Sequence, residues 1–168
     1  DAASWPALSA ALAAAAFVCT SVEFDRDGTV VGDPTEIALA DLAARTGTTA
    51  TPADRNARRR LTYAFDPRLA RMATVDVDDD DDSLRVHVKG APEELIGLCT
   101  SIATSTGARP MSSTDHDAFA AQLEQWAKRG LRVLAVAEKT LPGPPPTSRS
   151  QAESELTLLG LVAMVDPP

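Results

Sequence analysis

The stretch VKGAPEEL, residues 88–95, joins two different patterns of hydrophobic residues. Before it, LRVHVK alternates apolar and polar residues as a strand does, and after it PEELIGLC places apolar residues at helical spacing. The pattern predicts a strand, a turn over residues 89–91, and a helix that begins at Pro92 and still contains Cys99. Gly90 and Pro92 are enough to explain a plain strand-to-helix connection, and the residues alone favour that reading. A ligand site at the turn is the alternative.

The chain before this turn carries the start signals of several elements. Ser4 and Pro6 are typical of a helix start, as are Asp33 and Pro34, and Glu36 stands where it would complete a capping box with Asp33. The expected elements are a helix over 4–18, a hairpin over 21–32, helices over 33–47 and 51–60, and strands over 61–65, 72–77 and 84–88.

After the turn, the sequence predicts a long helix over 112–129 and a buried strand over 131–139. Residues 141–155 are rich in proline and polar residues, so they are expected to form an irregular surface loop before a last strand over 157–165. Strands grouped in hairpins, with helices between them, indicate an α+β fold: an antiparallel sheet of about six strands flanked by helices.

Composition narrows the possible functions. A length of 168 residues fits a single domain, expected to be monomeric, and a net charge of −8 argues against binding nucleic acid. The longest apolar run, 10–19, is about half of what a bilayer span needs and is expected to be a core helix. Cys19 and Cys99 lie far apart in the sequence, which favours buried, reduced thiols.

Several common catalytic motifs are absent from the sequence. None of the three lysines follows a glycine, which excludes a P-loop, and no GxGxxG or GxSxG motif occurs. His87 and His116 are isolated from each other and from the cysteines, so neither a metal site nor a catalytic residue is predicted. The acidic run at 78–82 is interpreted as a solvated hairpin tip. Its alternative, a Mg²⁺ or Ca²⁺ site in a non-enzymatic regulatory or interaction domain, is a competing hypothesis.

Five segments together carry a family resemblance: GDPTEIAL (32–39), FDPRLARMATV (65–75), VKGAPEEL (88–95), GLRVLAVAEK (130–139) and GLVAMVDPP (160–168). In this order and spacing they resemble the nucleotide-binding domain of P-type cation-transporting ATPases, and the likeness looks closest to the calcium-pump-like branch, with a bacterial origin expected. The resemblance implies one nucleotide-binding domain over 1–168, excised between two hinges. It further implies a cytoplasmic part of an integral protein of the cell membrane, which works with phosphorylation and transmembrane domains of the same chain.

The resemblance also implies the chemistry of the whole pump. ATP hydrolysis would drive transport of Ca²⁺ or a similar cation through an aspartyl-phosphate formed in the separate phosphorylation domain, where Mg²⁺ is mainly bound. These 168 residues contain no Asp-Lys pair of that kind. The chain is therefore expected to bind ATP and present its γ-phosphate, with no catalytic residue and no hydrolysis of its own.

The resemblance implies a role in ATP binding for three residues, and the chemistry of each side chain suits its role. Phe65 would stack on adenine, Glu36 would meet the edge of the base, and Arg132 would reach the phosphates. An arginine inside an apolar strand needs a partner, which a phosphate would supply. Phe65 is equally compatible with the core, and Glu36 with the capping box.

Four further residues complete the predicted ATP site. Lys89 would line the pocket from a strand end at the edge of the sheet, Gly90 and Ala91 would keep the floor small, and Met72 would pack near the base. Met72 is just as suited to filling the core.

The sequence departs from the family pattern at Ala70, which stands where the family usually has a lysine. Arg68 and Arg71 are the candidate substitutes. The loss predicts a weak affinity for the nucleotide, with ATP bound mainly through its base and ribose.

Overall fold

The computed structural model describes residues 5–20, 23–24, 30–48, 51–78 and 83–165. The helices in these ranges are α1 (Trp5–Val18), α2 (Pro34–Arg45), α3 (Pro52–Arg58), α4 (Pro92–Leu95), α5 (Ser113–Lys128) and α6 (Arg149–Ala152), and Ile96–Leu98 adds one 3₁₀ turn. The strands are β1 (Glu23–Phe24), β2 (Val30–Val31), β3 (Arg59–Asp66), β4 (Arg71–Val77), β5 (Leu84–Gly90), β6 (Cys99–Thr104), β7 (Gly107–Pro110), β8 (Arg132–Leu141) and β9 (Leu156–Met164).

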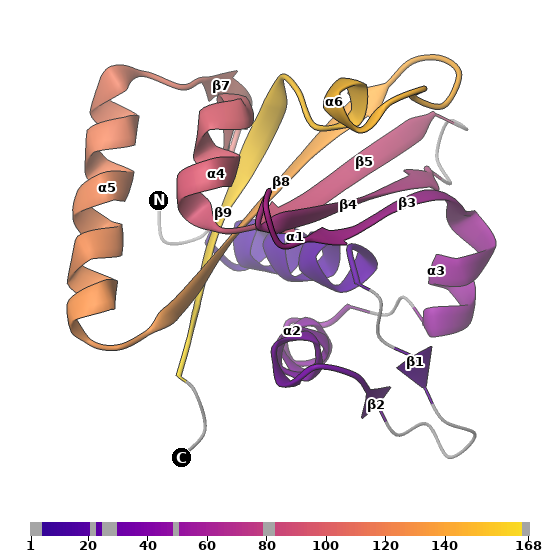
Figure 1. The fold of residues 1–168 in the computed structure, drawn as a ribbon, viewed down its shortest axis with the longest axis horizontal. Coiled ribbons are helices and arrows are strands. Elements are labelled where there is room, and N and C mark those ends of the chain that lie inside the picture. Colours follow the sequence, from indigo (N-terminus) through magenta and orange to yellow (C-terminus); the bar gives the residue numbers. More distant parts are fainter. Residues whose placement is uncertain (1–4, 21–22, 25–29, 49–50, 79–82, 166–168) are drawn as a thin grey trace.

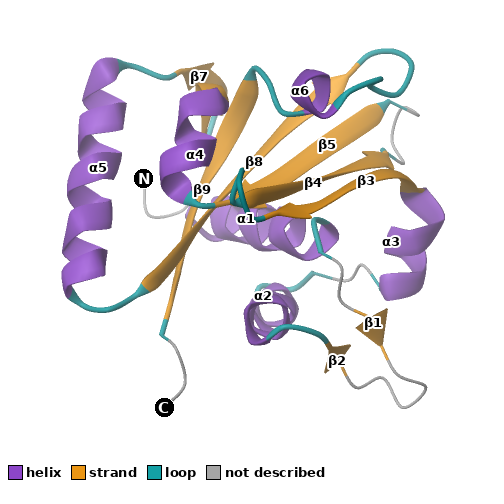
Figure 2. Cartoon of the chain, in the orientation of Figure 1, coloured by secondary structure: helices purple, strands orange, loops and turns teal. Residues whose placement is uncertain are grey.

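One seven-stranded sheet organises the described part of the chain, in the order β3-β4-β5-β8-β9-β6-β7 (Figure 2). Neighbouring strands run antiparallel except β6 and β9, which are parallel. The short strands β1 and β2 pair separately, as expected for the predicted hairpin, whose turn lies outside the described residues. The predicted α+β class is therefore confirmed, with one strand more in the main sheet than the estimate of about six.

The two faces of this sheet are covered by different helices (Figure 1). On one face, α4, α5 and α6 pack on a core built from alternate residues of β4, β5 and β8, among them Val75, Val86 and Ala137. On the other face, α1 lies across the sheet and α2 packs on α1, with Val136 and Val162 beneath them. We call these the apolar face and the α1 face.

Capping residues explain where the helices begin. Asp33, Thr51, Ser112 and Ser148 each accept a backbone hydrogen bond at a helix start. Thr51 and Ser112 form complete capping boxes. The predicted helix starts at 33, 51 and 112 are thus confirmed.

The predicted helix after Pro92 continues past α4 as the 3₁₀ turn Ile96–Leu98, and the prediction is wrong at Cys99. α4 ends at Leu95, and Cys99 begins β6 instead of continuing the helix. Cys99 pairs with Leu156 of β9, and the hairpin of β6 with β7 extends the sheet. Long-range pairing with β9 therefore overrides the short helical spacing, which cannot by itself distinguish a helix from a buried turn.

The prediction of an irregular loop over 141–155 is also wrong in part. This segment contains α6, and Pro146, Ala152 and Glu153 in it are buried. Ser148 caps α6 by accepting from the Gln151 amide, so a single helical turn forms despite the unfavourable composition.

Candidate functional site

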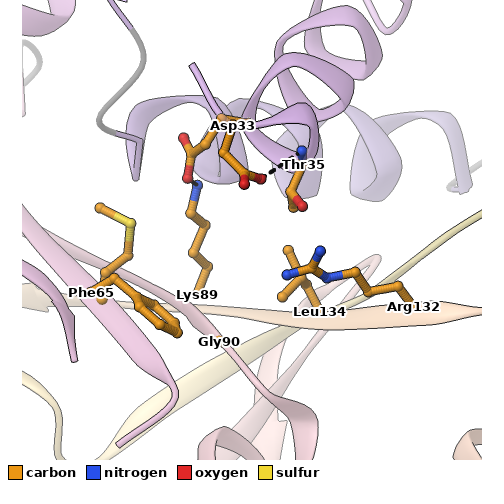
Figure 3. Close-up of a pocket in the computed structure, with 9 residues that line it drawn as sticks. Asp33, Thr35, Phe65, Lys89, Gly90, Arg132 and Leu134 are labelled. Atoms are coloured by element: carbon orange, nitrogen blue, oxygen red, sulfur yellow. Dashed lines mark hydrogen bonds and ion pairs between the residues drawn. The ribbon is translucent and has the colours of Figure 1, made fainter. Parts of the chain in front are cut away.

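A pocket of about 270 Å³ opens between the start of α2 and the strands β3, β4, β5 and β8 (Figure 3). It is lined by Asp33, Thr35, Glu36, Phe65, Met72, Lys89, Gly90, Arg132 and Leu134. Six of the seven predicted site residues are among them, although they come from four separate segments of the sequence. Ala91 is the exception, because it does not line the pocket.

Helix α2 supplies one wall through its first turn. Asp33 Oδ1 accepts a hydrogen bond from the Thr35 amide at 2.8 Å, and this backbone hydrogen bond holds the pKa of Asp33 below its ordinary value. The predicted capping box is not formed, since the Glu36 side chain turns away from the Asp33 backbone toward Lys89. Asp33 alone therefore caps the helix and leaves Glu36 available to the pocket.

Glu36 and Lys89 form a buried ion pair at the back of the pocket. Lys89 Nζ lies 2.5 Å from Glu36 Oε1, with only 5% and 13% of the two side chains exposed. Lys89 is not at the edge of the sheet as predicted, because β5 is an interior strand between β4 and β8. The second oxygen of the carboxylate, Glu36 Oε2, is buried and has no hydrogen-bond partner among the described residues. A buried acceptor of this kind is costly unless a ligand or water satisfies it.

Phe65 and Arg132 stand on opposite sides of the pocket, with Lys89 between them (Figure 3). Phe65 lies in β3 and is 59% exposed, which rules out its alternative role as a core residue. Met72 in β4 is buried beside Lys89, its partner across the strands, and also lines the cavity. The pocket thus offers one aromatic face that is open to a ligand.

Gly90 is required by a close approach of two strands. A Cβ on Gly90 would lie 2.5 Å from the Ala70 carbonyl oxygen and 2.8 Å from the Arg71 Cα, so any other residue would force β4 and β5 apart. Ala91 adds to the same contact, because its amide donates to the Ala70 carbonyl at 2.9 Å. The end of β5 at Gly90 therefore forms part of the pocket wall, and its position is fixed by the close backbone contact with Ala70 and Arg71.

Arg132 occupies a different environment from the one predicted. It begins β8 and is exposed, so its guanidinium does not need a buried partner. Its side chain reaches the pocket above Leu134, which lies two residues further along the strand (Figure 3). Period-two alternation from Arg132 would have identified Leu134 from the sequence, and Asp33 and Thr35 lie in the GDPTE segment itself.

The two arginines considered as substitutes for the missing lysine do not line the pocket. Arg68 is in the turn after β3 with 90% of its side chain exposed, and Arg71 is paired with Glu153 at 2.7 Å. Ala70 adopts a positive φ of 48° in the same turn. The formal charges of the lining residues therefore cancel: Asp33 and Glu36 against Lys89 and Arg132.

The described residues offer little support for other chemistry. No group of three or more histidine, cysteine or acidic side chains within them is arranged to hold a metal ion. No helix in the same ranges is long and apolar enough to cross a membrane. Asp78 of the acidic run is bound to Arg85 at 2.6 Å, and the rest of that run lies outside the described residues.

Comparisons with known proteins identify the family of this chain. Residues 8–168 match the family described as P-type ATPase, cytoplasmic domain N. The chain is 36% identical over 143 residues to a cation-transporting ATPase of Synechocystis, covering 84% of this chain and 15% of that protein. It is 34% identical over 145 residues to a calcium-transporting ATPase of Bacillus subtilis, covering 85% and 16%. It is 29% identical over 151 residues to calcium-transporting ATPase 1 of Lactococcus lactis, covering 90% and 17%.

The chain spans 15–17% of the length of these relatives, so the comparisons concern one part of much longer proteins. The matched segment includes every residue that lines the pocket. With the family matched over nearly the whole chain, the protein belongs to the P-type ATPase family as its cytoplasmic N domain.

Proposed function

We propose that the chain binds ATP in the pocket beside α2 and presents the γ-phosphate to an aspartate in another domain of a P-type ATPase. The observation that carries the proposal is the pocket itself, which gathers six residues predicted for ATP binding from four distant segments. In the whole protein, binding would serve ATP-driven cation transport across a membrane, with Ca²⁺ or a similar cation as cargo. Mg²⁺ would be held mainly outside this domain.

The orientation of the nucleotide follows from the groups that lack partners. The exposed ring of Phe65 offers a stacking surface for adenine. Glu36 Oε2 would accept a hydrogen bond from an amino group on the edge of the base, which would satisfy its buried acceptor. Lys89 would act mainly by holding Glu36 in place, because its ammonium is already committed to that carboxylate.

The phosphates would lie toward Arg132, outside the enclosed part of the cavity. A volume of about 270 Å³ is near the lower end of the ~300–1,000 Å³ typical of ligand pockets, which suits base and ribose better than a whole triphosphate. The cancelling charges of the lining support the same orientation. Binding would therefore depend more on the base than on the phosphates.

ATP titration of the purified chain, followed by calorimetry, tests this proposal. Phe65→Ala should weaken binding about 5- to 150-fold, equivalent to ~1–3 kcal/mol of stacking. Val31→Ala removes an equally exposed apolar side chain outside the pocket and serves as the matched control. Equal ATP affinity in both variants would exclude the pocket.

A second titration separates base from phosphate. Arg132→Ala should lower the affinity for ATP more than that for adenosine, whereas Arg68→Ala, which removes an arginine outside the pocket, should change neither. Inorganic triphosphate that binds as tightly as ATP would contradict the proposed orientation.

A further inference from the structure

A second charged cluster lies on the apolar face, on the opposite side of the sheet from the Glu36–Lys89 pair. Glu153, directly after α6, is 2% exposed and accepts from two arginines: Arg71 Nε at 2.7 Å and Arg149 Nε at 2.8 Å. We call Arg71, Arg149 and Glu153 the arginine–glutamate cluster. None of its members lines the pocket, so it is not explained by direct contact with a ligand.

Arg149 ties the cluster to the two strands that carry Phe65 and Met72. Its Nη2 atom lies within hydrogen-bond distance of the carbonyls of Ala64 at 2.7 Å, Tyr63 at 3.2 Å and Arg71 at 3.2 Å. Its guanidinium also lies over the Tyr63 ring, 5.9 Å from the centroid. A planar guanidinium presents several donors in a fixed fork, so this one side chain fixes the ends of β3 and β4 together.

Phe65 itself has little to hold it. Its side chain is 59% exposed, and it does not belong to a hydrophobic cluster of the described residues. The peptide unit just before it contains the Ala64 carbonyl, which receives the shortest of the Arg149 contacts. The backbone that orients the Phe65 ring is therefore held by Arg149 from the apolar face of the sheet.

The same cluster supports the pocket floor. Arg71 is held by Glu153, and the Arg71 Cα and Cβ lie against Gly90, where a side chain on the glycine would overlap them. The next residue back, Ala70, accepts from the Ala91 amide. Glu153 thus reaches both the Phe65 side of the pocket, through Arg149, and the floor, through Arg71.

From this geometry we infer that Arg149 and Glu153 are positioning residues for the nucleotide, which set the angle of the Phe65 ring without touching the ligand. The inference rests on the proposed ATP site. Arg149 acts through the Ala64 carbonyl, and Glu153 acts by orienting Arg149 and Arg71.

A double-mutant cycle between Arg149 and Phe65 tests the inference. Arg149→Lys keeps the charge but loses the fork, and it should weaken ATP binding about tenfold, in the range of coupling between residues of one network. In the Phe65→Ala background, the same change should have little further effect, because there is no ring left to aim. The NMR signals of the Phe65 ring should shift in Arg149→Lys without ATP.

Arg109→Lys is the matched control. Arg109 on β7 is likewise paired through two nitrogens, with Asp115 at 2.6 and 2.7 Å, but lies outside the pocket lining and outside the cluster. It should leave both ATP affinity and the Phe65 signals unchanged. If Arg149→Lys fails to fold, Glu153→Gln, which keeps the shape and one acceptor, replaces it in the same cycle.

The outcomes distinguish this inference from the proposed function. If wild type and Phe65→Ala bind ATP equally, the ATP site is wrong and the inference falls with it. If Phe65→Ala weakens binding while Arg149→Lys behaves like Arg109→Lys, the inference alone is overturned. An equal loss from Arg149→Lys with and without the Phe65 ring also overturns it, because the effect would then come from the fold as a whole.

Discussion

The two faces of the central sheet are both buried, but they are stabilised in different ways. On the apolar face, β4 and β5 present Ala73, Val75, Val86 and Val88, which are fully buried in one hydrophobic cluster. On the α1 face, the alternate positions of the same two strands are mostly polar: Thr74, Asp76, His87 and Lys89 are buried there, together with the apolar Met72. Apart from Arg71, which begins β4 and pairs with Glu153 on the apolar face, the two strands therefore place most of their apolar packing on one side and most of their buried charge on the other.

The charges of the α1 face are connected from strand to strand. Arg59 donates to Asp76 at 2.6 Å, and His87 lies between Asp76 and Glu138, 3.6 and 3.7 Å from their carboxylates. Arg85 bridges Glu138 and Asp78. Burying such groups gains little stability compared with apolar packing. Of the buried polar residues that β4 and β5 present on the α1 face, only Lys89 lines the pocket, whereas the apolar face carries the larger hydrophobic cluster.

The largest expected effect on stability comes from breaking the buried pair of the α1 face. Lys89→Ala leaves the Glu36 carboxylate buried and uncompensated, which should cost about 3–5 kcal/mol of unfolding free energy in urea denaturation. Replacing both partners, as Glu36→Gln with Lys89→Met, should recover most of this loss without restoring ATP affinity. Equal instability of the single and double variants would mean that the pair itself stabilises the fold.

A cavity on the apolar face should lower the unfolding free energy by as much as Lys89→Ala or by less, through lost packing and not through an uncompensated charge. Leu158 is fully buried in the apolar cluster, and Leu158→Ala should lower the unfolding free energy by about 2–5 kcal/mol. This loss should not depend on pH between 5 and 8, since no charge is uncovered. ATP affinity that falls as far as in Phe65→Ala would show that the two faces are not independent.

As pH falls, the contacts of the α1 face should lose stability while the packing of the apolar face does not change. Burial favours a higher pKa for Asp76, but His87 and Arg59 beside it outweigh burial and keep the pKa below its ordinary value. Because the folded-state pKa is the lower one, the stabilisation is present at neutral pH and is lost as pH falls below about 4. Asp76→Asn should therefore flatten the acid limb of the stability curve, measured by urea denaturation from pH 2 to 6. An unchanged acid limb would assign the loss to other carboxylates.

The smallest effect is expected for the two thiols, one on each face. Cys19 lies against the strands of the α1 face, and burial raises its pKa to about 11; Cys99 belongs to the apolar cluster, and burial raises its pKa to about 12. With a pKa two units above the ordinary 9.0, the thiolate is about 100-fold less populated at pH 8. Iodoacetamide should label neither thiol in the native protein, and both in urea. Selective native labelling of Cys19 would indicate local opening of the α1 face.

Much of the fold could be predicted because its signals are local. The segments LTYAF, MATVDV and LRVHV predicted β3, β4 and β5, and three helix starts were predicted at the Asp33 cap, at Thr51 and at Ser112. The errors lie where distant contacts decide the structure. Cys99 leaves the helix because β9 pairs with it. α6 forms in a proline-rich segment where Arg149 contacts Ala64 of β3 and Glu153 contacts Arg71 of β4.

The sequence could also predict which residues line the candidate site, but it could not predict how those side chains pair or where their strands lie in the sheet. The motif segments gave Glu36, Phe65, Lys89 and Arg132, and all four line one pocket. The sequence left Glu36 divided between a cap and a ligand contact, and it placed Lys89 at an edge. Neither point could be decided without knowing that β5 is an interior strand and that the two side chains meet.

By itself, the sequence determined which residues alternate, where helices begin and which segments carry the family motifs, because each of these depends on neighbours a few positions away. Only the tertiary structure decided that Lys89 is neutralised by Glu36, that Phe65 is open, and that Glu153 supports the pocket from the opposite face. The physical reason is that these charge pairs join residues 53 and 82 positions apart, whose meeting depends on strand order.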